Sequence, residues 1–527
     1  MAGPIIFIHT YFTDFDKQKA FGSWRLPNNG HRILSHLYKF SQRRKQQSNM
    51  PSDVVIQIEN IFHPRSVAVI GVSDKNHRLG NLLLHSFMDM GFKGDLYPVN
   101  PREDQVMELR CYPSLRAIDG PLDLVIISVH PKGVPDLIED CVAKGVKAAV
   151  IFSSGFREKG GEGLRAEAEI VHKARAGGVR IIGPNCMGLY SPSSGLSFFP
   201  GMPKESGTVA FLSQSGSLTN LLGLFAGSRG IRFSKMISVG NAADLDANDF
   251  LEYLGYDSET RLVVLYLEGV EDGRRFLSLA KDISLKKPIL LWKGGETEGG
   301  RKAAGSHTGS LSGSGEIWEA AIRQAGMVKV ENLNELIGFI TAFQNPYLPM
   351  GNRVAIMSGP GGPAVSAADA CEKEGLRLAR LSGETEKMLA DFVPEFGASI
   401  SNPVDLSIAS SFDQTMYPRA TELCGLDENV DLIVEYISAL REGMIEGIIQ
   451  AQERVRKPIA IVSSMEYATF ESPFSRFFGS ITREKLMALL MKMYDSGISI
   501  HATEQEAARA LSSLLKYKKY LDSRHPL

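Results

Sequence analysis

The sequence has few cysteines, no long apolar run and no excess of either charge. The five cysteines include no CxxC pair, which argues against a disulfide framework or a zinc site and favours a reducing cytoplasm. They are Cys111, Cys141, Cys186, Cys371 and Cys424. No apolar run reaches the roughly 18 to 20 residues that span a bilayer. Lys and Arg total 58 against 60 Asp and Glu, so net charge does not favour nucleic acid or an anionic membrane as a partner. We therefore expect a cytoplasmic protein without a metal site, in which any anion binds locally.

The first fifty residues differ from the rest of the chain. Residues 1–50 hold eight Lys or Arg residues and two acidic residues, and they show no pattern of a folded domain. Such a leader is typical of an organelle transit peptide, but a complete domain start follows Met50 and leads us to prefer translation from Met50. The 527 residues suffice for roughly three or four domains. We expect domains at 51–193, 194–345 and 346–527.

Strands and helices alternate from Ser66 onward. "SVAVIGVS" is a continuous β-branched run, typical of a parallel strand covered on both faces, and a segment with helical spacing follows it. Further buried strands are expected in "GDLYPVNP", "LDLVIISV" and "KAAVIFSSGF". This alternation predicts a Rossmann-like, doubly wound parallel sheet whose ligand crevice lies at the carboxyl ends of the strands. Nine residues should surround that pocket: Gly71, Val72, Ser73, Asn100, Val129, Pro131, Ser153, Ser154 and Gly155.

The turn after the first strand of this sheet argues against a dehydrogenase. It reads "GVSDKNHRLGN" and lacks the dinucleotide fingerprint GxGxxG, since Gly71 and Gly80 lie nine positions apart. A basic turn at a helix N-terminus still suits a nucleotide diphosphate, because backbone N–H groups, the helix dipole and Arg78 all favour anions. The alternative is that Arg78 is a solvated loop residue.

Two later segments repeat one pattern, in which a buried strand runs through small residues into a helix. The first contains Ser213, Ser215, Gly216 and Ser217, and the second contains Gly359, Gly361 and Gly362. Hydroxyls and free backbone N–H groups at a positive helix end predict a phosphate site in each. The alternative in each case is a close-packed turn.

A histidine lies between these two segments, in "KAAGSHTGSLSG". His307 is surrounded by small residues, so we expect a flexible loop that presents the imidazole to a ligand. The strand "RLVVLYLEG" ends at Glu268, and a carboxylate there could orient an imidazole for attack on phosphorus. Nearby acidic residues are alternatives to Glu268: Glu271, Asp272 and Glu296.

Six motifs together resemble one enzyme family. They are "GPNCMG" (183–188), "SQSGSL" (213–218), "VGNAADLD" (239–246), "AAGSHTGSLSG" (303–313), "GPGGP" (359–363) and "NPVDLS" (402–407). Over residues 50–520 the chain resembles the α subunit of ADP-forming acyl-CoA synthetases, the acetate–CoA ligases (ADP-forming) related to succinyl-CoA synthetase. The first motif adds Asn185 to the candidate CoA-binding residues. Met187 stands where the succinyl-CoA enzymes have Pro, which leaves the acid substrate open.

The resemblance implies both a fold and a mechanism. The fold would be a CoA-binding domain followed by two flavodoxin-like ligase domains. His307 would carry phosphate transiently and Glu268 would orient it, while the two helix ends hold phosphate. The sequence shows no nucleotide-binding domain, so ATP or ADP and Mg²⁺ are expected on an ATP-grasp β subunit, in an αβ or α2β2 assembly.

Two other functions compete with this reading. A non-catalytic CoA-binding or regulatory protein would keep the first domain but would not need His307, Glu268 and both helix ends. A fused protein acetyltransferase would need an acyltransferase domain, for which no length remains. The acid and the physiological direction are not determined by the sequence.

Overall fold

The computed structural model describes residues 51–75, 78–308, 313–359, 361–438, 440–463 and 482–524, with no side chains for 306–308 and 483. Contacts divide the chain into two compact units, residues 1–56 and 57–527. Helix α3 (Asp53–Phe62) contains the boundary between them. The leader expected at residues 1–50 lies outside the described residues. The three large sheets all belong to the second unit.

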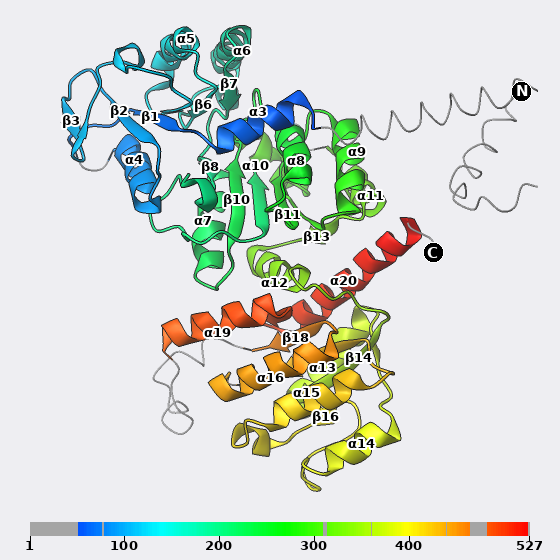
Figure 1. Cartoon of the computed structure of the whole chain (residues 1–527). Helices are drawn as coiled ribbons and strands as arrows, with labels where there is room; N and C mark the ends of the chain where they lie inside the picture. Colours follow the sequence, from blue (N-terminus) through cyan, green and yellow to red (C-terminus); the bar gives the residue numbers. More distant parts are fainter. Residues whose placement is uncertain are drawn as a thin grey trace, which may run out of the picture. The chain divides into compact units, whose positions relative to one another are not determined.

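The first sheet is fully parallel and has the strand order β2-β1-β5-β6-β7. Each strand expected from an apolar run is present, and each ends one to four residues before the polar positions that follow it. The elements of this part of the chain (Figure 1) are β1 (Ser66–Ile70), α4 (Leu79–Met90), β2 (Asp95–Val99), β3 (Gln105–Val106), β4 (Leu109–Arg110), η1 (Leu115–Ala117), β5 (Leu124–Ile127), η2 (Pro131–Gly133), α5 (Val134–Lys144), β6 (Ala148–Ile151), η3 (Arg157–Lys159), α6 (Gly161–Ala176) and β7 (Arg180–Ile182).

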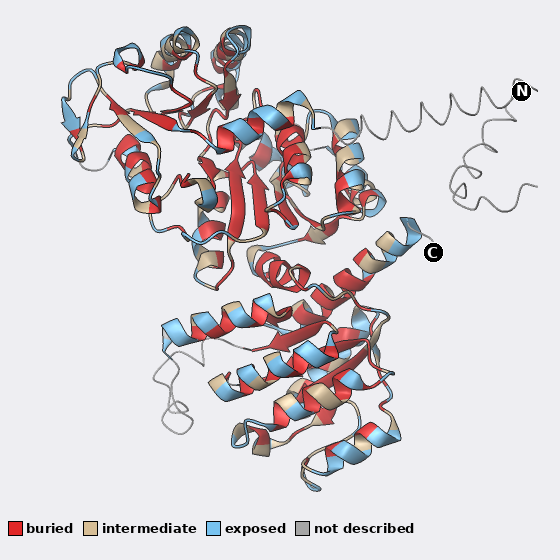
Figure 2. Cartoon of the chain, viewed as in Figure 1, coloured by how far each residue is buried: buried red, intermediate tan, exposed pale blue. Residues whose placement is uncertain are grey.

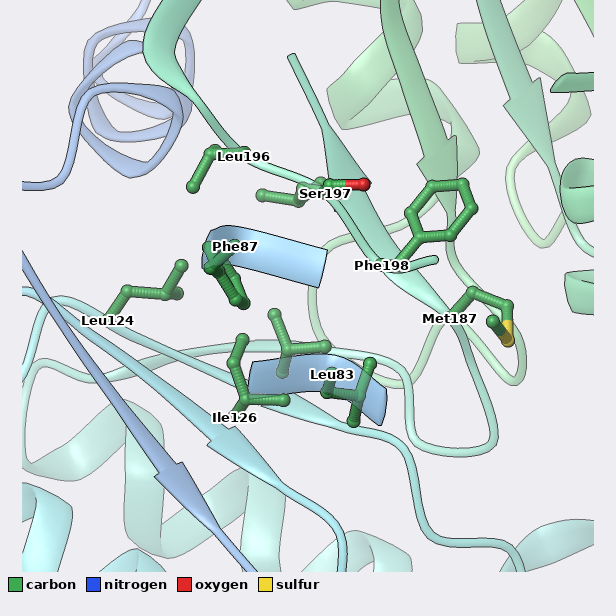
Figure 3. Close-up of a pocket in the computed structure, with 10 residues that line it drawn as sticks. Leu83, Phe87, Leu124, Ile126, Met187, Leu196, Ser197 and Phe198 are labelled. Atoms are coloured by element: carbon green, nitrogen blue, oxygen red, sulfur yellow. The ribbon is translucent and has the colours of Figure 1, made fainter. Parts of the chain in front are cut away.

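Both faces of this sheet are covered, as the apolar runs predict. Val125 and Ile127 of β5 belong to the core formed with α5 and α6. Their neighbours Leu124 and Ile126 point to the opposite face, because side chains alternate along a strand. There they line a small apolar cavity with Leu83 and other residues of α4 (Figure 3). The strands are consequently buried along their length, whereas the helices bury one side (Figure 2).

The second sheet has the order β13-β12-β11-β9-β10-β8 and is parallel except for β8. Strand β8 pairs with β10, so the chain enters this sheet before the domain boundary expected after residue 193. The elements here are β8 (Gly188–Tyr190), η4 (Pro192–Ser194), β9 (Val209–Ser213), α7 (Gly216–Gly227), β10 (Phe233–Ser238), α8 (Ala247–Tyr256), β11 (Leu262–Leu267), α9 (Gly273–Ser284), β12 (Ile289–Lys293), α10 (Glu298–Thr308), α11 (Gly315–Ala325), β13 (Val328–Val330) and α12 (Leu333–Phe343).

The third sheet is also parallel, with the order β15-β14-β17-β18-β19 and the short β16 paired to β14. Together the three sheets confirm the predicted α/β class. The elements here are β14 (Arg353–Ser358), α13 (Gly361–Lys373), β15 (Arg377–Leu378), α14 (Gly383–Ala390), β16 (Val404–Asp405), η5 (Ile408–Ser411), α15 (Met416–Leu426), β17 (Leu432–Tyr436), α16 (Glu442–Val455), β18 (Ile459–Val462), α19 (Arg483–Asp495), β19 (Ile498–His501) and α20 (Glu504–Arg524).

Candidate active site

The residues expected around a CoA pocket meet at the carboxyl edge of the first sheet. Asn100 Nδ2 donates to the carbonyl of Val72 at 2.6 Å, which joins the ends of β2 and β1. The Ser153 hydroxyl donates to the carbonyl of Val129, which joins the ends of β6 and β5. The N–H of Asn185 donates to the carbonyl of Ser153 at 3.0 Å. Five predicted residues from four strand ends and the segment after β7 therefore lie in one connected edge.

Glycines let the backbone segments of this edge approach closely. Gly71 has φ +97°, and a Cβ there would come 2.1 Å from the Ser128 carbonyl oxygen. A Cβ on Gly80 would come 2.4 Å from the Gly71 carbonyl oxygen. Gly155 lies against Pro131 in the same way, with a Cβ 2.8 Å from Pro131 Cγ. Any side chain at these positions would displace backbone or ring atoms, so the edge is shaped by their absence.

The turn between β1 and α4 depends on a residue that the sequence did not single out. Buried Asn81 accepts the N–H of Ser73 at 2.9 Å and donates to the carbonyls of Ser73 and Lys75 at 2.8 and 2.9 Å. Arg78 is the N-cap residue of α4 and is exposed, so a cation stands at a helix N-terminus as predicted. Ser154 is exposed as well. Asn81 resembles any polar helix residue in the sequence and gives no signal of this role.

The turn from β9 into α7 has the geometry predicted for an anion site, with one difference. The Ser215 side chain caps α7 and accepts the N–H of Leu218 at 3.3 Å. The Ser213 hydroxyl accepts the N–H of Ser215 at 3.0 Å and donates to its carbonyl at 2.9 Å, so it is used within the turn. The N–H groups of Gly216 and Ser217 belong to the first helical turn, where no intrahelical acceptor exists. These groups and the helix dipole remain for an anion.

Glu268 lies next to this turn. It follows β11 directly, is 4% exposed, and its N–H donates to Gln214 Oε1 at 2.5 Å. The same oxygen accepts the N–H of Gly269 at 3.1 Å. Gln214 belongs to the turn that starts α7, so one side chain fixes the carboxylate-bearing end of β11 to the predicted anion site.

The acidic alternatives to Glu268 have other partners. Glu271 is exposed and pairs with Arg157 at 3.2 Å. Asp272 caps α9 through two backbone N–H groups. Glu296 pairs with Lys329 at 3.0 Å. Burial therefore distinguishes Glu268 from its neighbours, which the sequence left open.

A buried lysine beside Glu268 was also missed. Lys293 ends β12 and is 5% exposed, and its Nζ donates to the carbonyl of Glu268 at 2.7 Å and to that of Gly294. The ammonium also lies 5.3 Å from the centre of the Trp318 ring. Burial lowers the pKa of Lys293 to about 8, against the pull of two neighbouring carboxylates. In the sequence it is one more lysine at the end of an apolar run.

His307 lies in a helix, so the prediction of a loop across residues 302–308 was wrong. Helix α10 runs from Glu298 to Thr308. Ala303 and Ala304 are strong helix formers, and an acidic residue in the first turn suits the helix dipole. These preferences outweigh the glycines on which the loop prediction rested. Residues 309–312 lie outside the described residues, as does the side chain of His307.

The turn from β14 into α13 differs from its counterpart before α7. The N–H of Gly359 donates to the Tyr417 hydroxyl at 2.7 Å and is thereby satisfied. A Cβ on Gly361 would lie 2.8 Å from Asp405 Oδ2, so a carboxylate already faces this helix end. Gly362 has open space around it. The repeated sequence pattern gives two similar backbones, but the charge at their helix ends differs.

A polar network connects the CoA-side edge with the second sheet. Glu158 of η3 accepts the N–H of Gly155, and its second oxygen accepts from Asn241 Nδ2 at 2.7 Å. Arg157 donates to the Asn241 carbonyl at 2.7 Å and to Glu167 at 2.6 Å. Helix α10 also packs beside η3. The predicted CoA edge and the helix that carries His307 therefore share a neighbour.

Two further searches cover only the described residues. They hold no group of three or more His, Cys, Asp or Glu side chains arranged to bind a metal ion. Within the same ranges, no helix is both long and apolar enough to cross a membrane.

Comparisons with known proteins identify all three sheets. A CoA binding domain family matches residues 65–192, a succinyl-CoA ligase-like flavodoxin domain matches 206–343, and a ligase-CoA domain matches 354–444. The fold and the site thus define a CoA ligase of the succinyl-CoA ligase type.

Individual relatives narrow this class. The α subunit of acetate–CoA ligase (ADP-forming) II from Pyrococcus furiosus is 39% identical over 470 residues, covering 88% of this chain and 98% of its own length. Acetate–CoA ligase (ADP-forming) I from Archaeoglobus fulgidus is 40% identical over 382 residues, which cover 72% of this chain and 55% of that longer protein. Dinucleotide-forming acetyl-coenzyme A synthetase 1 from Ca. Korarchaeum cryptofilum, solved with phosphate and ADP, matches with a TM-score of 0.76 at 31% identity over 89% of this chain and 99% of that chain. The chain belongs to the ADP-forming acyl-CoA synthetases, in the family of acetate–CoA ligase α subunits.

Proposed function

We propose that this chain interconverts acyl-CoA, ADP and phosphate with a carboxylic acid, CoA and ATP through an acyl phosphate and a phosphohistidine at His307. In the first step, phosphate oxygen attacks the thioester carbon, the C–S bond breaks, and CoA leaves as an acyl phosphate forms. In the second step, an imidazole nitrogen of His307 attacks phosphorus and releases the carboxylate. In the third step, ADP takes the phosphoryl group and becomes ATP. All three steps are reversible transfers of one group.

The observation that best supports this proposal is the bond between Gln214 and the end of β11. It places the buried Glu268 beside the positive N-terminus of α7. N–H groups at that helix end can hold phosphate, while a carboxylate accepts an imidazole N–H and stabilises its positive charge. Glu268 is our candidate for that carboxylate and Ser215, Gly216 and Ser217 for the phosphate site.

CoA would bind at the carboxyl edge of the first sheet. Backbone atoms at this edge approach closely because the glycines leave room, and Arg78 at the N-terminus of α4 would meet a phosphate of CoA. The proposed contacts come from Gly71, Val72, Ser73, Arg78, Gly80, Asn100, Val129, Pro131, Ser153, Ser154, Gly155 and Asn185. The second helix end, at Gly361 and Gly362, remains a proposed anion site even though Asp405 lies beside it.

The helix around His307 bears on how phosphate would travel. Helix α10 has glycine at three of its eleven positions, and each costs about 1 kcal/mol relative to alanine in a helix interior. We propose that the end of α10 unwinds when the phosphohistidine leaves the first site for the nucleotide. The small residues around His307 would then serve two phosphate sites in turn.

The nucleotide would bind on a second subunit. The chain covers 98% of a relative named as an α subunit but 55% of a longer single-chain ligase of the same family. We propose an ATP-grasp β subunit that holds ATP or ADP with Mg²⁺, in an αβ or α2β2 assembly in the cytoplasm. Acetate is the first acid to test, since these relatives are named acetate–CoA ligases.

Phosphorylation of His307 tests the mechanism. The full chain, incubated with acetyl-CoA and radiolabelled phosphate, should take up an acid-labile, base-stable label, and His307→Asn should abolish it. Label that persists in this variant would overturn the assignment. A wild type that binds CoA by calorimetry but takes up no label would instead indicate a non-catalytic CoA-binding or regulatory protein.

The partner has its own test. The chain alone, given acetyl-CoA, phosphate and ADP, should form no more than one phosphoryl group per site and should not make ATP continuously. Addition of an ATP-grasp β subunit should start sustained ATP synthesis. Continuous synthesis by the lone chain would place a nucleotide site on this polypeptide and refute the assembly.

A further inference from the structure

Lys293 holds the strand end that carries Glu268. Its ammonium donates to the backbone carbonyls of Glu268 and Gly294, so it ties the end of β11 to the end of β12 beyond the last ladder bond. The side chain is 5% exposed, and a buried ammonium is unfavourable unless its protons are satisfied. A neutral residue would pack here at lower cost, so the charge itself requires an explanation.

The indole of Trp318 covers the other side of this ammonium. Trp318 lies in α11 with its ring centre 5.3 Å from Lys293 Nζ. The same ring lies beside Gly313, where a Cβ would come 3.3 Å from Trp318 Nε1. Gly313 has φ +66° and is the first described residue after the segment that follows His307. A continuous chain of contacts therefore runs from the Glu268 carbonyl through Lys293 and Trp318 to Gly313.

Several charged groups surround Lys293. Glu268 and Tyr266 face it from β11, and Glu296 and Arg301 from the start of α10. Lys329 on β13 pairs with Glu296. The net field of these groups is close to balanced, so burial determines the protonation of Lys293.

We infer that Lys293 and Trp318 are positioning residues for phosphoryl transfer, which hold the Glu268 end of β11 and the exit of the His307 segment in one rigid frame. This inference rests on the proposed function, since it assigns a role in the phosphorylation of His307. Neither residue would touch the phosphoryl group. Their effect would be to keep the carboxylate and the histidine-bearing segment at a fixed separation, on which group transfer depends steeply.

Replacement of Lys293 by Met and by Arg tests the lysine. The initial rate of His307 labelling should fall about 10-fold or more in Lys293→Met, the effect of losing a buried charged hydrogen bond, with the KM for phosphate and acetyl-CoA within twofold of wild type. Lys293→Arg should restore part of the rate. The matched control is Lys287→Met, because Lys287 is also partly buried and donates to the carbonyls of Leu254 and Asp257 at 2.7 and 2.6 Å. That variant should label at the wild-type rate.

The dependence of labelling on pH separates positioning from loss of folding. The Lys293 ammonium is complete below its pKa of about 8 and is lost above it, so the wild-type rate should fall as pH rises through 8. This fall should disappear in Lys293→Met, move to higher pH in Lys293→Arg, and persist in Lys287→Met. For the tryptophan, Trp318→Phe should retain most of the rate and Trp318→Leu should not, because phenylalanine keeps an aromatic face.

The outcomes of these experiments are distinguishable. If Lys293→Met labels at the wild-type rate, or if it and Lys287→Met lose activity equally, the inference is overturned while the proposed function stands. If an unchanged pH profile accompanies a reduced rate, the lysine has a structural role only, and the inference again fails. A wild type that takes up no label overturns the proposed function and the inference together.

Discussion

Replacement of Gly305 by Ala should slow the transfer of phosphate from His307 to ADP without slowing its arrival. Gly305 lies in the interior of α10, two residues before His307, and it is exposed. A Cβ at this position would meet no atom within 4 Å, so the substitution disturbs no packing. Its main effect is to stabilise the helix. Gly300, whose Cβ would lie 3.1 Å from Thr297 Oγ1, lacks this advantage.

The magnitude follows from helix propensity. Alanine is favoured over glycine by about 1 kcal/mol in a helix interior, which lowers the population of an unwound α10 about 5-fold. If unwinding must precede transfer to the nucleotide, the transfer rate should fall by the same factor. Ala303→Gly is the matched control with the opposite sign, since Ala303 is exposed in the same helix. It should raise the unwound population and leave transfer at least as fast as in wild type.

A two-stage single-turnover assay measures this. The chain is first labelled at His307 with acetyl-CoA and radioactive phosphate, and the β subunit is then added with ADP while labelled ATP is followed in a quench-flow instrument. We expect labelling within twofold of wild type in both variants and ATP formation about 5-fold slower in Gly305→Ala. Equal ATP formation rates in Gly305→Ala, Ala303→Gly and wild type would show that α10 need not unwind, and would refute the reasoning.

Three further substitutions test the site more directly. Glu268→Gln should reduce turnover by ~10²-fold or more because it weakens the orientation of the imidazole, whereas Glu271→Gln should retain activity; the reverse order in steady-state kinetics would exchange their roles. Arg78→Ala should weaken CoA binding by ~1 to 3 kcal/mol in calorimetry, while Lys93→Ala at the far end of α4 should not; NAD binding without CoA binding would restore the dehydrogenase reading. Gly71→Ala should cost about 2 to 5 kcal/mol, the sum of backbone strain at positive φ and a clash with a neighbouring carbonyl, and an unchanged melting temperature would contradict this.

The alternation of strands and helices was predictable because the signals are local. Buried parallel strands need continuous apolar runs, and the turns that follow them need small residues, so Ser66 to Ser73 and Ser213 to Ser217 could be read without knowledge of the rest. The same rule placed Glu268 at a strand end on the crevice side. Helix α10 was misread for a local reason as well, since glycine and alanine alternate there and the weight given to each decides the outcome.

Buried polar contacts could not be predicted, because they are made between residues far apart in the chain. Lys293 and Asn81 look like ordinary surface residues until the fold removes them from water and brings carbonyl groups to them. The same holds for Asp405, which reaches the N-terminus of α13 and makes the second helix end unlike the first. The sequence by itself thus determined the three sheets, the edges at which ligands can bind and the candidate histidine. Only the tertiary structure decided which carboxylate is buried and which helix end is free of negative charge, since burial and electrostatic environment are properties of packed neighbours.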